Sequence, residues 1–411
     1  MIISFSVKNF GSIKDKITLS FEARKSKKLE DYYLIKNKVN GKDYRLLKLI
    51  MLYGPNASGK STIIKAINFL RNLVLKPAKS KSEELEFEPF LFDTQTPKQN
   101  SEIELDFLVD NHRFRYVVEF NKKAIIKEEL YKLDKKKSLF LSRVTDIDKQ
   151  FTKIEKSQLK NGKSKILESF TLWNNTVLGA FSKANIDDET LKVIYNWFND
   201  NLMEVISGET DLTTLIWDFI TKEKIDKSKL LRIISEADFS LVDLNEKETW
   251  SKSREELLNS FKKKSLVSTH LIKEKEYYQL NFGDESKGTQ RYFGLAGLLS
   301  LMIKNPKIVL IDEIEASIHP DLIWHFILTF LVNTKNSQLV ASTHLRDLLA
   351  EEDSIRTDSI WFTELKEDRS TDLFSLADYP KKELKNIYQA YKIGKYGAKP
   401  KLKDYYLDLE D

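Results

Sequence analysis

The stretch Gly54-Pro-Asn-Ala-Ser-Gly-Lys-Ser-Thr62 decides the fold of this chain. It matches the phosphate-binding loop pattern G-x-x-x-x-G-K-[ST]. The apolar run at residues 46–53 is typical of a buried strand, and residues 62–74 carry apolar side chains at helical spacing. A strand, a glycine-rich loop and a helix in this order form the context that the motif requires, so the sequence predicts a site for nucleotide phosphates.

The residue types in this loop suit phosphate chemistry. Glycines allow positive φ and a close approach of the backbone, and the N–H groups of residues 56–61 are expected to form an anion nest at the start of the helix. We expect Lys60 to contact the β- and γ-phosphates of ATP and to serve in catalysis, and Ser61 to bind Mg²⁺. The predicted nucleotide-binding residues of the loop are Gly54, Asn56, Ala57, Ser58, Gly59, Lys60, Ser61 and Thr62. A glycine-rich turn that begins a helix by chance is the alternative.

Composition limits the compartment and the chemistry. The 411 residues include no cysteine, which excludes disulfides and thiolate metal sites. Residues 1–7 alternate like a strand and lack the basic start of a signal peptide, and no apolar run approaches the ~18 residues of a membrane span. We therefore expect a cytoplasmic protein with no membrane partner. Acidic residues nearly balance the basic ones. The net charge of +5 is therefore only weak support for a nucleic-acid partner.

Two further apolar runs end in polar side chains. Ile308-Val-Leu-Ile-Asp-Glu313 predicts a buried strand that carries two carboxylates at its end, the Walker B arrangement. Asp312 is expected to hold Mg²⁺, and Glu313 is expected to orient or deprotonate the attacking water. Residues 338–344 form another such run, and its last residue, His344, is a candidate for contact with the γ-phosphate. A histidine at a strand end can also be structural.

The segment before the acidic strand carries a resemblance. Residues 285–291, Glu-Ser-Lys-Gly-Thr-Gln-Arg, precede an expected helix and then the acidic strand. This order resembles the signature motif of ABC-type ATPase heads, in the variant of SMC-like and OLD-like proteins. In that family two heads enclose two ATP molecules. The resemblance therefore implies a homodimer or higher homo-oligomer, in which Ser286 and Gly288 contact the nucleotide bound by the other head.

Other segments extend the resemblance and also limit it. Residues 315–320 resemble the D-loop of this family, and His344 resembles its switch histidine. Lys287 and Thr289 depart from the ABC consensus of the signature. No residue is identified as the Q-loop glutamine, for which Gln95 and Gln99 are the candidates.

Both ends of the chain resemble a narrower group. Asn9-Phe-Gly-Ser12 is similar to the N-terminal strand and turn of SMC-like heads. Residues 390–400, Ala-Tyr-Lys-Ile-Gly-Lys-Tyr-Gly-Ala-Lys-Pro, resemble the C-terminal signature of a bacterial AAA-family subgroup found in abortive-infection and other defence loci. The resemblance implies a role in anti-phage defence.

These patterns together predict an α/β protein, a P-loop NTPase with an ABC-ATPase-like head. We expect a mixed sheet with an N-terminal antiparallel β-lobe, and a mostly helical insertion, because 252 residues separate Lys60 from Asp312. The predicted domains are residues 1–145 with the phosphate loop, residues 146–236 as a helical and basic insertion, and residues 237–411 with the signature, Walker B strand and switch histidine. Alternating segments within residues 3–21 and 103–118 predict two β-hairpins.

Three functions compete at this point. The first is an ATP-hydrolysing head that pairs around ATP and regulates a separate toxic effector, such as a nuclease, in a defence system. The second is a DNA-binding SMC-like repair or genome-maintenance ATPase, in which the basic region 132–165 contacts nucleic acid. A solvated surface is an alternative for that region. The third is a scaffold that binds ATP and scarcely hydrolyses it, which Asp312, Glu313 and His344 argue against.

Overall fold

The computed structural model describes residues 1–237, 239–249, 263–273, 276–380, 384 and 386–399. The chain forms two compact units. The first unit contains residues 1–207, 306–314 and 335–411, and the second contains residues 208–305 and 315–334. Each unit is described by itself below.

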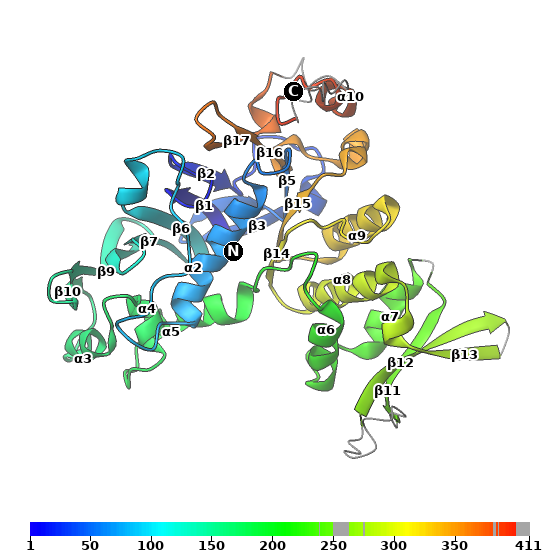
Figure 1. Cartoon of the computed structure of the whole chain (residues 1–411), viewed down its shortest axis with the longest axis horizontal. Helices are drawn as coiled ribbons and strands as arrows, with labels where there is room; N and C mark the ends of the chain where they lie inside the picture. The colour runs from blue at the N-terminus through cyan, green and yellow to red at the C-terminus, as the bar shows by residue number, and fades with distance from the viewer. Residues whose placement is uncertain (238, 250–262, 274–275, 381–383, 385, 400–411) are drawn as a thin grey trace, which may run out of the picture. The chain divides into compact units, whose positions relative to one another are not determined.

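A seven-stranded antiparallel sheet fills much of the first unit (Figure 1). Its strand order is β10-β9-β8-β7-β6-β1-β2, and β1 pairs with both β2 and β6. The two hairpins predicted from alternation are confirmed by the antiparallel pairs β1–β2 and β6–β7. The strands are β1 (Ile2–Lys8), β2 (Ile17–Ser20), β6 (Ser101–Val109), β7 (His112–Phe120), β8 (Ile125–Leu133), β9 (Lys137–Asp146) and β10 (Phe151–Ser157).

A second sheet carries the phosphate loop. Its order is β14-β15-β5-β16-β17, in which β17 alone is antiparallel to its neighbour. All residues of the central strand β5 are buried, as the continuous apolar run predicted. The bounds are β5 (Leu49–Tyr53), β14 (Ile308–Ile311), β15 (Gln338–Thr343), β16 (Ile360–Leu365) and β17 (Thr371–Ser375).

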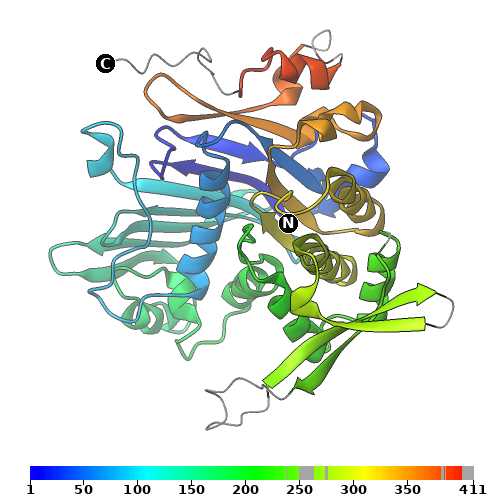
Figure 2. The same cartoon turned by 45° about the vertical axis from the view of Figure 1, so that its right-hand side comes forward.

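The helix α2 (Lys60–Leu75) follows the phosphate loop and crosses the face of the seven-stranded sheet (Figure 2). Its buried side chains, Ile63 and Ile67 among them, belong to the same core cluster as Leu105 of β6 and Leu52 of β5. One helix thus packs against both sheets, and this fixes the position of the loop from which the helix begins.

The remaining elements of the first unit are shorter. A two-stranded sheet pairs β3 with β4. The others surround the two main sheets (Figure 1). Their bounds are α1 (Glu30–Tyr33), β3 (Leu34–Val39), β4 (Lys42–Leu47), α3 (Lys163–Phe170), α4 (Val177–Phe181), α5 (Glu189–Asn196), η5 (Arg346–Ala350) and α10 (Ile387–Lys392).

The second unit centres on α8, whose buried side chains include Leu295 and Leu298. Gly294 and Gly297 let α6 approach closely, because a Cβ atom at Gly294 would lie 2.3 Å from the Leu212 side chain. The unit also contains a three-stranded antiparallel sheet, β11-β12-β13. The bounds are α6 (Leu212–Thr221), α7 (Lys227–Ser235), β11 (Leu241–Thr249), β12 (Lys263–Lys273), β13 (Glu276–Asn281), α8 (Lys287–Lys304) and α9 (Pro320–Asn333).

Two local expectations need correction. Residues 151–157, placed by the sequence in a mostly helical insertion, form β10, the edge strand of the seven-stranded sheet. Arg143, counted with the basic region 132–165, has no exposed surface, because it pairs with the buried Glu128. The helices α3 to α7 do follow within the predicted helical range. The division into residues 1–145, 146–236 and 237–411 stays a prediction beside the observed compact units.

Candidate nucleotide-binding site

The phosphate loop leaves β5 and turns into α2 with left-handed backbone at two positions. Ala57 has φ of 62° and Gly59 has φ of 103°. A Cβ atom at Gly59 would lie 2.1 Å from Thr371 Oγ1, and one at Gly54 would lie 2.4 Å from Thr363 Oγ1. Glycine is therefore required at both ends of the loop, because a side chain at either position would collide with the threonines packed against it.

Lys60 lies over the loop that precedes it. Its ammonium donates to the carbonyl oxygens of Gly54 (2.8 Å) and Pro55 (3.0 Å), and the residue is 5% exposed. The cation is thus held at the mouth of the loop, where it would meet phosphate oxygens. This placement agrees with the role expected from the motif, which stays a prediction.

Asp312 connects the loop to the end of β14. Ser61 Oγ donates to Asp312 Oδ1 over 3.0 Å, and Ser342 Oγ donates to the same oxygen over 2.5 Å. A hydroxyl next to a carboxylate is a donor set that suits Mg²⁺, which in nucleotide sites takes one or two carboxylates together with phosphate oxygens. In the described ranges no group of three His, Cys, Asp or Glu side chains is arranged to hold a metal ion. The fit for Mg²⁺ therefore depends on phosphate oxygens of the nucleotide.

Glu313 follows Asp312 in a left-handed conformation. Its φ is 55°, an uncommon value for a residue with a side chain, and its N–H donates to Ser342 Oγ over 2.8 Å. The N–H of Ile314 donates to the carbonyl of Ser342 over 3.1 Å. The same serine thus holds the backbone on both sides of Glu313, whose side chain is exposed.

His344 leaves the sheet at the same edge as the phosphate loop. The parallel register pairs Thr343 of β15 with Tyr53 of β5, so His344 and Gly54 each follow the last residue of neighbouring strands. The side chain of His344 is exposed. Within the first unit, the structure therefore brings together the loop, Asp312, Glu313 and His344, as the sequence predicted from separate motifs.

A serine and threonine layer supports the loop from behind. Ser12 Oγ contacts Thr371 Oγ1 (2.7 Å) and donates to Thr62 Oγ1 (3.1 Å), and Ser58 Oγ contacts Thr363 Oγ1 (2.5 Å). These contacts link the N-terminal turn, the loop and the strands β16 and β17. They explain why residue 62 carries a hydroxyl although it follows the motif's serine.

A tether of charges holds the N-terminal turn to neighbouring loops. Lys14 pairs with Asp93 (3.1 Å) and Asp368 (3.0 Å). Hydrogen bonds from Ser370 and then from Lys14 lower the pKa of Asp368 to about 2. Hydrogen bonds from Thr96 lower the pKa of Asp93 as well. The candidate Q-loop residues Gln95 and Gln99 lie in this loop, which is pinned where Asn9 Nδ2 donates to the Thr96 and Gln99 carbonyls.

The predicted signature lies in the second unit. Ser286 is the N-cap of α8, and its Oγ accepts from the N–H of Thr289 over 3.0 Å. Ser286 is exposed, and Gly288 is half-buried, where a Cβ atom would lie 3.2 Å from the Ser317 carbonyl oxygen. An exposed, capped helix start suits contact with an anion of another molecule.

Sequence reasoning missed three side chains of the site. Ser342 was read only as part of an apolar strand, and Ser12 and Thr363 were not considered as supports of the loop. The signal for Ser342 was a hydroxyl two residues before His344, inside a buried run. The role of Ser342 follows from the register, which pairs Ala341 with Ile311 and so sets Ser342 beside Asp312.

The fold and these side chains define a class of protein. A phosphate loop in a largely parallel sheet, with an acidic strand two places away and an antiparallel lobe against the loop helix, is an ABC-ATPase-like fold. Residues 49–351 match the family described as "AAA domain, putative AbiEii toxin, Type IV TA system". The match covers more than half of the chain, so the chain belongs to this family. It is an AAA-family ATPase with an ABC-ATPase-like fold.

Two SMC heads are among the solved structures that the chain resembles. The SMC head domain from Thermotoga maritima is 14% identical, with a TM-score of 0.44 over 91% of this chain and 98% of that chain. An SmcHead bound to the C-winged helix domain of ScpA is 13% identical, with a TM-score of 0.48 over 91% of this chain and 97% of that chain. No curated protein compared with the chain matches it. The helices that the structure describes include none long and apolar enough to cross a membrane.

Proposed function

We propose that this chain binds and hydrolyses ATP with Mg²⁺, pairs with a second copy around the nucleotide, and regulates a toxic effector protein in an anti-phage defence system. The observation that carries the proposal is the contact of Ser61 and Asp312 at 3.0 Å, beside the exposed carboxylate of Glu313. It joins the two halves of a phosphoryl-transfer site that lie 251 residues apart in the chain.

Each residue has a proposed role in hydrolysis. Gly54 and residues 56–62 hold the phosphates, and Lys60 neutralises the charge that develops on them. Ser61 and Asp312 hold Mg²⁺, which when bound polarises the phosphate oxygens. Glu313 accepts a proton from the attacking water, and His344 positions the terminal phosphate.

Head pairing is proposed from the second unit. Ser286 and Gly288 open a helix whose start is exposed, and they lie on a compact unit separate from the phosphate loop. In the paired form, these residues contact the nucleotide held by the other copy. Closure then depends on ATP, and hydrolysis ends it.

The effector is proposed to be a separate protein. The family description names a toxin and a Type IV toxin–antitoxin system, which supports a partner of this kind. The tail motif from Ala390 onward supports a defence role by resemblance, and all of it but Pro400 lies within the described residues. The ring centroids of Tyr391 and Tyr53 lie 6.1 Å apart, so this motif packs next to the strand that leads into the phosphate loop.

A DNA-binding maintenance ATPase is the second candidate. The observation that favours it is the exposed lysines on the β9–β10 hairpin and edge strand, Lys149, Lys153 and Lys156. If these lysines bind phosphates of DNA, affinity falls steeply as salt is raised. If replacing these three lysines by glutamate leaves the affinity for DNA unchanged, the DNA-binding function is excluded.

Light scattering of the Glu313→Gln variant tests head pairing. We expect the mass to double when Mg-ATP is added, because ATP stays bound when the base is lost. A Lys60→Ala, Glu313→Gln double variant is the control, and its mass should not respond to ATP. A mass of Glu313→Gln that is the same with and without Mg-ATP would contradict nucleotide-driven pairing.

A further inference from the structure

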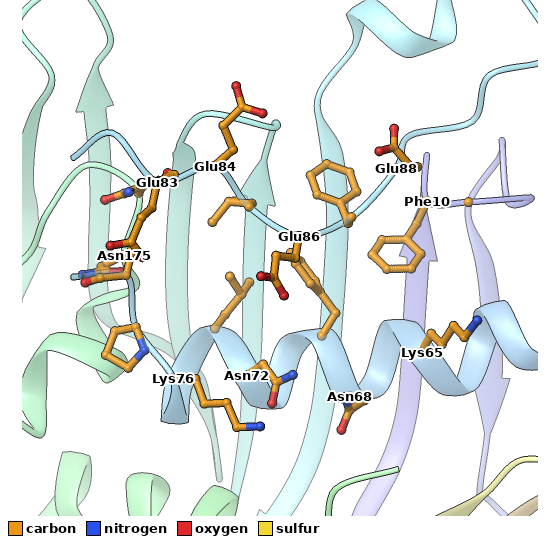
Figure 3. Close-up of a pocket in the computed structure, with 18 of the residues that line it drawn as sticks. Phe10, Lys65, Asn68, Asn72, Lys76, Glu83, Glu84, Glu86, Glu88 and Asn175 are labelled. Carbon is orange, nitrogen blue, oxygen red and sulfur yellow. Dashed lines mark hydrogen bonds between the residues drawn. The ribbon is translucent and has the colours of Figure 1, made fainter. Parts of the chain in front are cut away.

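A cleft of about 670 Å³ runs along the outer side of α2, the helix that begins in the phosphate loop. One wall is α2 with its C-cap, from Thr62 to Lys76, and the other is formed by residues 83–88, which we call the glutamate strap (Figure 3). The helix has 16 residues, about 24 Å at ~1.5 Å per residue. The cleft is thus long enough for an extended peptide of several residues.

The glutamate strap is fixed in place by backbone hydrogen bonds at Leu85 and Glu88. The N–H of Leu85 donates to the Lys122 carbonyl (2.8 Å), and the N–H of Gly11 donates to the Glu88 carbonyl (2.7 Å). Leu85 and Phe87 point into the core, and Phe87 stacks on Phe10 at 5.6 Å. The alternation leaves the glutamates between them exposed. The cleft is therefore preformed, which lowers the entropic cost of binding a ligand.

Two buried asparagines line the end of the cleft at the C-terminus of α2. Asn174 donates through Nδ2 to the Ser80 and Glu83 carbonyls, and Asn175 donates to the Ala78 carbonyl. These bonds fix the orientation of both amides. The residues are 1% and 4% exposed, yet within the described part of the chain neither Oδ1 atom has a hydrogen-bond partner. Both acceptors lack the donor that a buried polar atom needs.

Carboxylates line the strap side of the cleft, and Lys65 and Lys76 lie on the α2 side, where Lys76 pairs with Glu204. Glu83 accepts from the N–H groups of Lys79 and Ser80, and Glu88 pairs with Lys122. Glu86 is exposed and projects toward α2, whereas Glu84 points away from the helix (Figure 3). The acidic wall therefore offers one carboxylate directed into the cleft.

We propose that this cleft binds a lysine- or arginine-bearing segment of a partner protein, with a cationic head on Glu86 and donors for the Asn174 and Asn175 oxygens. The floor is apolar, with Phe69 and Leu73 each 8% exposed, and it suits the aliphatic stem of a long basic side chain. A carboxylate and two amide oxygens are all acceptors, so these three groups favour a cationic donor over a phosphate or an acidic peptide.

The cleft gives the partner a route to the nucleotide site. Thr62 and Lys65, from the first turns of α2, line its other end. This consequence rests on the proposed function, because a change in ATP turnover requires that the chain hydrolyse ATP. Binding in the cleft does not, and it can be measured without nucleotide.

Fluorescence anisotropy with a labelled hexalysine peptide tests the inference on the full chain without nucleotide. We expect saturable binding, weakened about tenfold by Glu86→Gln, because that change removes a charge-assisted hydrogen bond. Glu84→Gln is the matched control on the same strap, and it should change affinity much less. Thermal melting of both variants checks that the fold is retained.

Three results would overturn the inference. The first is equal loss of affinity in Glu84→Gln and Glu86→Gln, which would mark a diffuse surface charge. The second is binding of spermine as tight as that of hexalysine, which would mark a site for small cations. The third is binding of hexaglutamate. If the chain binds hexalysine through Glu86 but hydrolyses no ATP, the inference about the cleft is retained. Only the proposed function is then refuted.

Discussion

Asp312 at the end of β14 and Glu128 in β8 are both held by hydrogen bonds, but their surroundings differ. Asp312 is half-buried, and both of its hydroxyl donors contact one oxygen, Oδ1. Glu128 is 1% exposed and both of its oxygens are engaged, Oε1 by Tyr116 and Oε2 by the N–H of Val177. Arg143, fully buried, lies 3.4 Å away.

The difference separates a chemical carboxylate from a structural one. Burial raises the pKa of Glu128, and Arg143 and the N–H donors oppose that rise. Both carboxylate oxygens of Glu128 accept hydrogen bonds from neighbouring residues, and Glu128 thereby links β8 to the start of α4. Asp312 keeps capacity for a metal ion and its neighbours are short hydroxyls. A carboxylate with partners on one side is the better candidate for a metal ligand.

Breaking the structural pair should have the largest effect. Arg143→Met leaves the Glu128 charge buried without its partner, and we expect the free energy of unfolding to fall by about 3–5 kcal/mol. Urea denaturation followed by circular dichroism measures it. The double change with Glu128→Leu should recover part of the loss, since it removes the stranded charge. An unfolding free energy unchanged in Arg143→Met would contradict the structural role.

Asp312→Asn should show the reverse pattern. We expect ATP turnover to fall on the order of a hundredfold, because a metal ligand is lost, while the free energy of unfolding changes by less than about 1 kcal/mol. Steady-state phosphate release at several Mg²⁺ concentrations measures the first, and urea denaturation the second. A large loss of stability with normal turnover would mean that Asp312 is structural like Glu128.

Ser342 should act through Asp312 and Glu313. Ser342→Ala removes a donor to Asp312 and an acceptor for the Glu313 N–H, so we expect turnover to drop about tenfold and the Mg²⁺ requirement to rise. Ser359→Ala is the matched control: that serine is equally buried, and it donates to the Arg356 carbonyl instead. If both variants lose the same turnover, the effect of Ser342 is general destabilisation.

Breaking the exposed ion pair between Lys14 and Asp368 should have the smallest effect on stability, and this effect should depend on pH. The pKa of Asp368 is lowered to about 2 in the folded chain from 3.8. The stabilisation it gives is therefore present above the unfolded value and is lost as pH falls from about 4 toward 2. Asp368→Asn should flatten this part of the curve of urea midpoint against pH. Glu367→Gln, its exposed neighbour, should leave the curve unchanged.

The fold could be predicted because its signals are local. The loop at residues 54–62 identifies its flanking strand and helix, and alternation identifies β1, β2, β6 and β7. The predicted ABC-ATPase-like fold with an antiparallel lobe is confirmed. The edge strand β10 was missed because its polar residues outnumber its apolar ones, so charge obscured the alternation that leaves Thr152 buried.

Other features depend on pairs that sequence spacing does not show. Arg143 looks like one more surface cation until the β8–β9 register sets it opposite Glu128. Ser342 becomes a support of the site only through the order of β14 and β15. The roles of Lys60, Glu313 and His344 stay predictions, because structure shows their position and not their chemistry.

Hydrolysis of ATP by the Glu313→Gln variant tests the central claim most directly. The account predicts Mg²⁺-dependent phosphate release by the unchanged chain and at least about a hundredfold less by Glu313→Gln, since a positioned base is lost. Glu351→Gln, an exposed glutamate in the η5 region, serves as the control and should keep the normal rate. A normal rate in Glu313→Gln would contradict the assignment of Glu313 as the base and with it the proposed site.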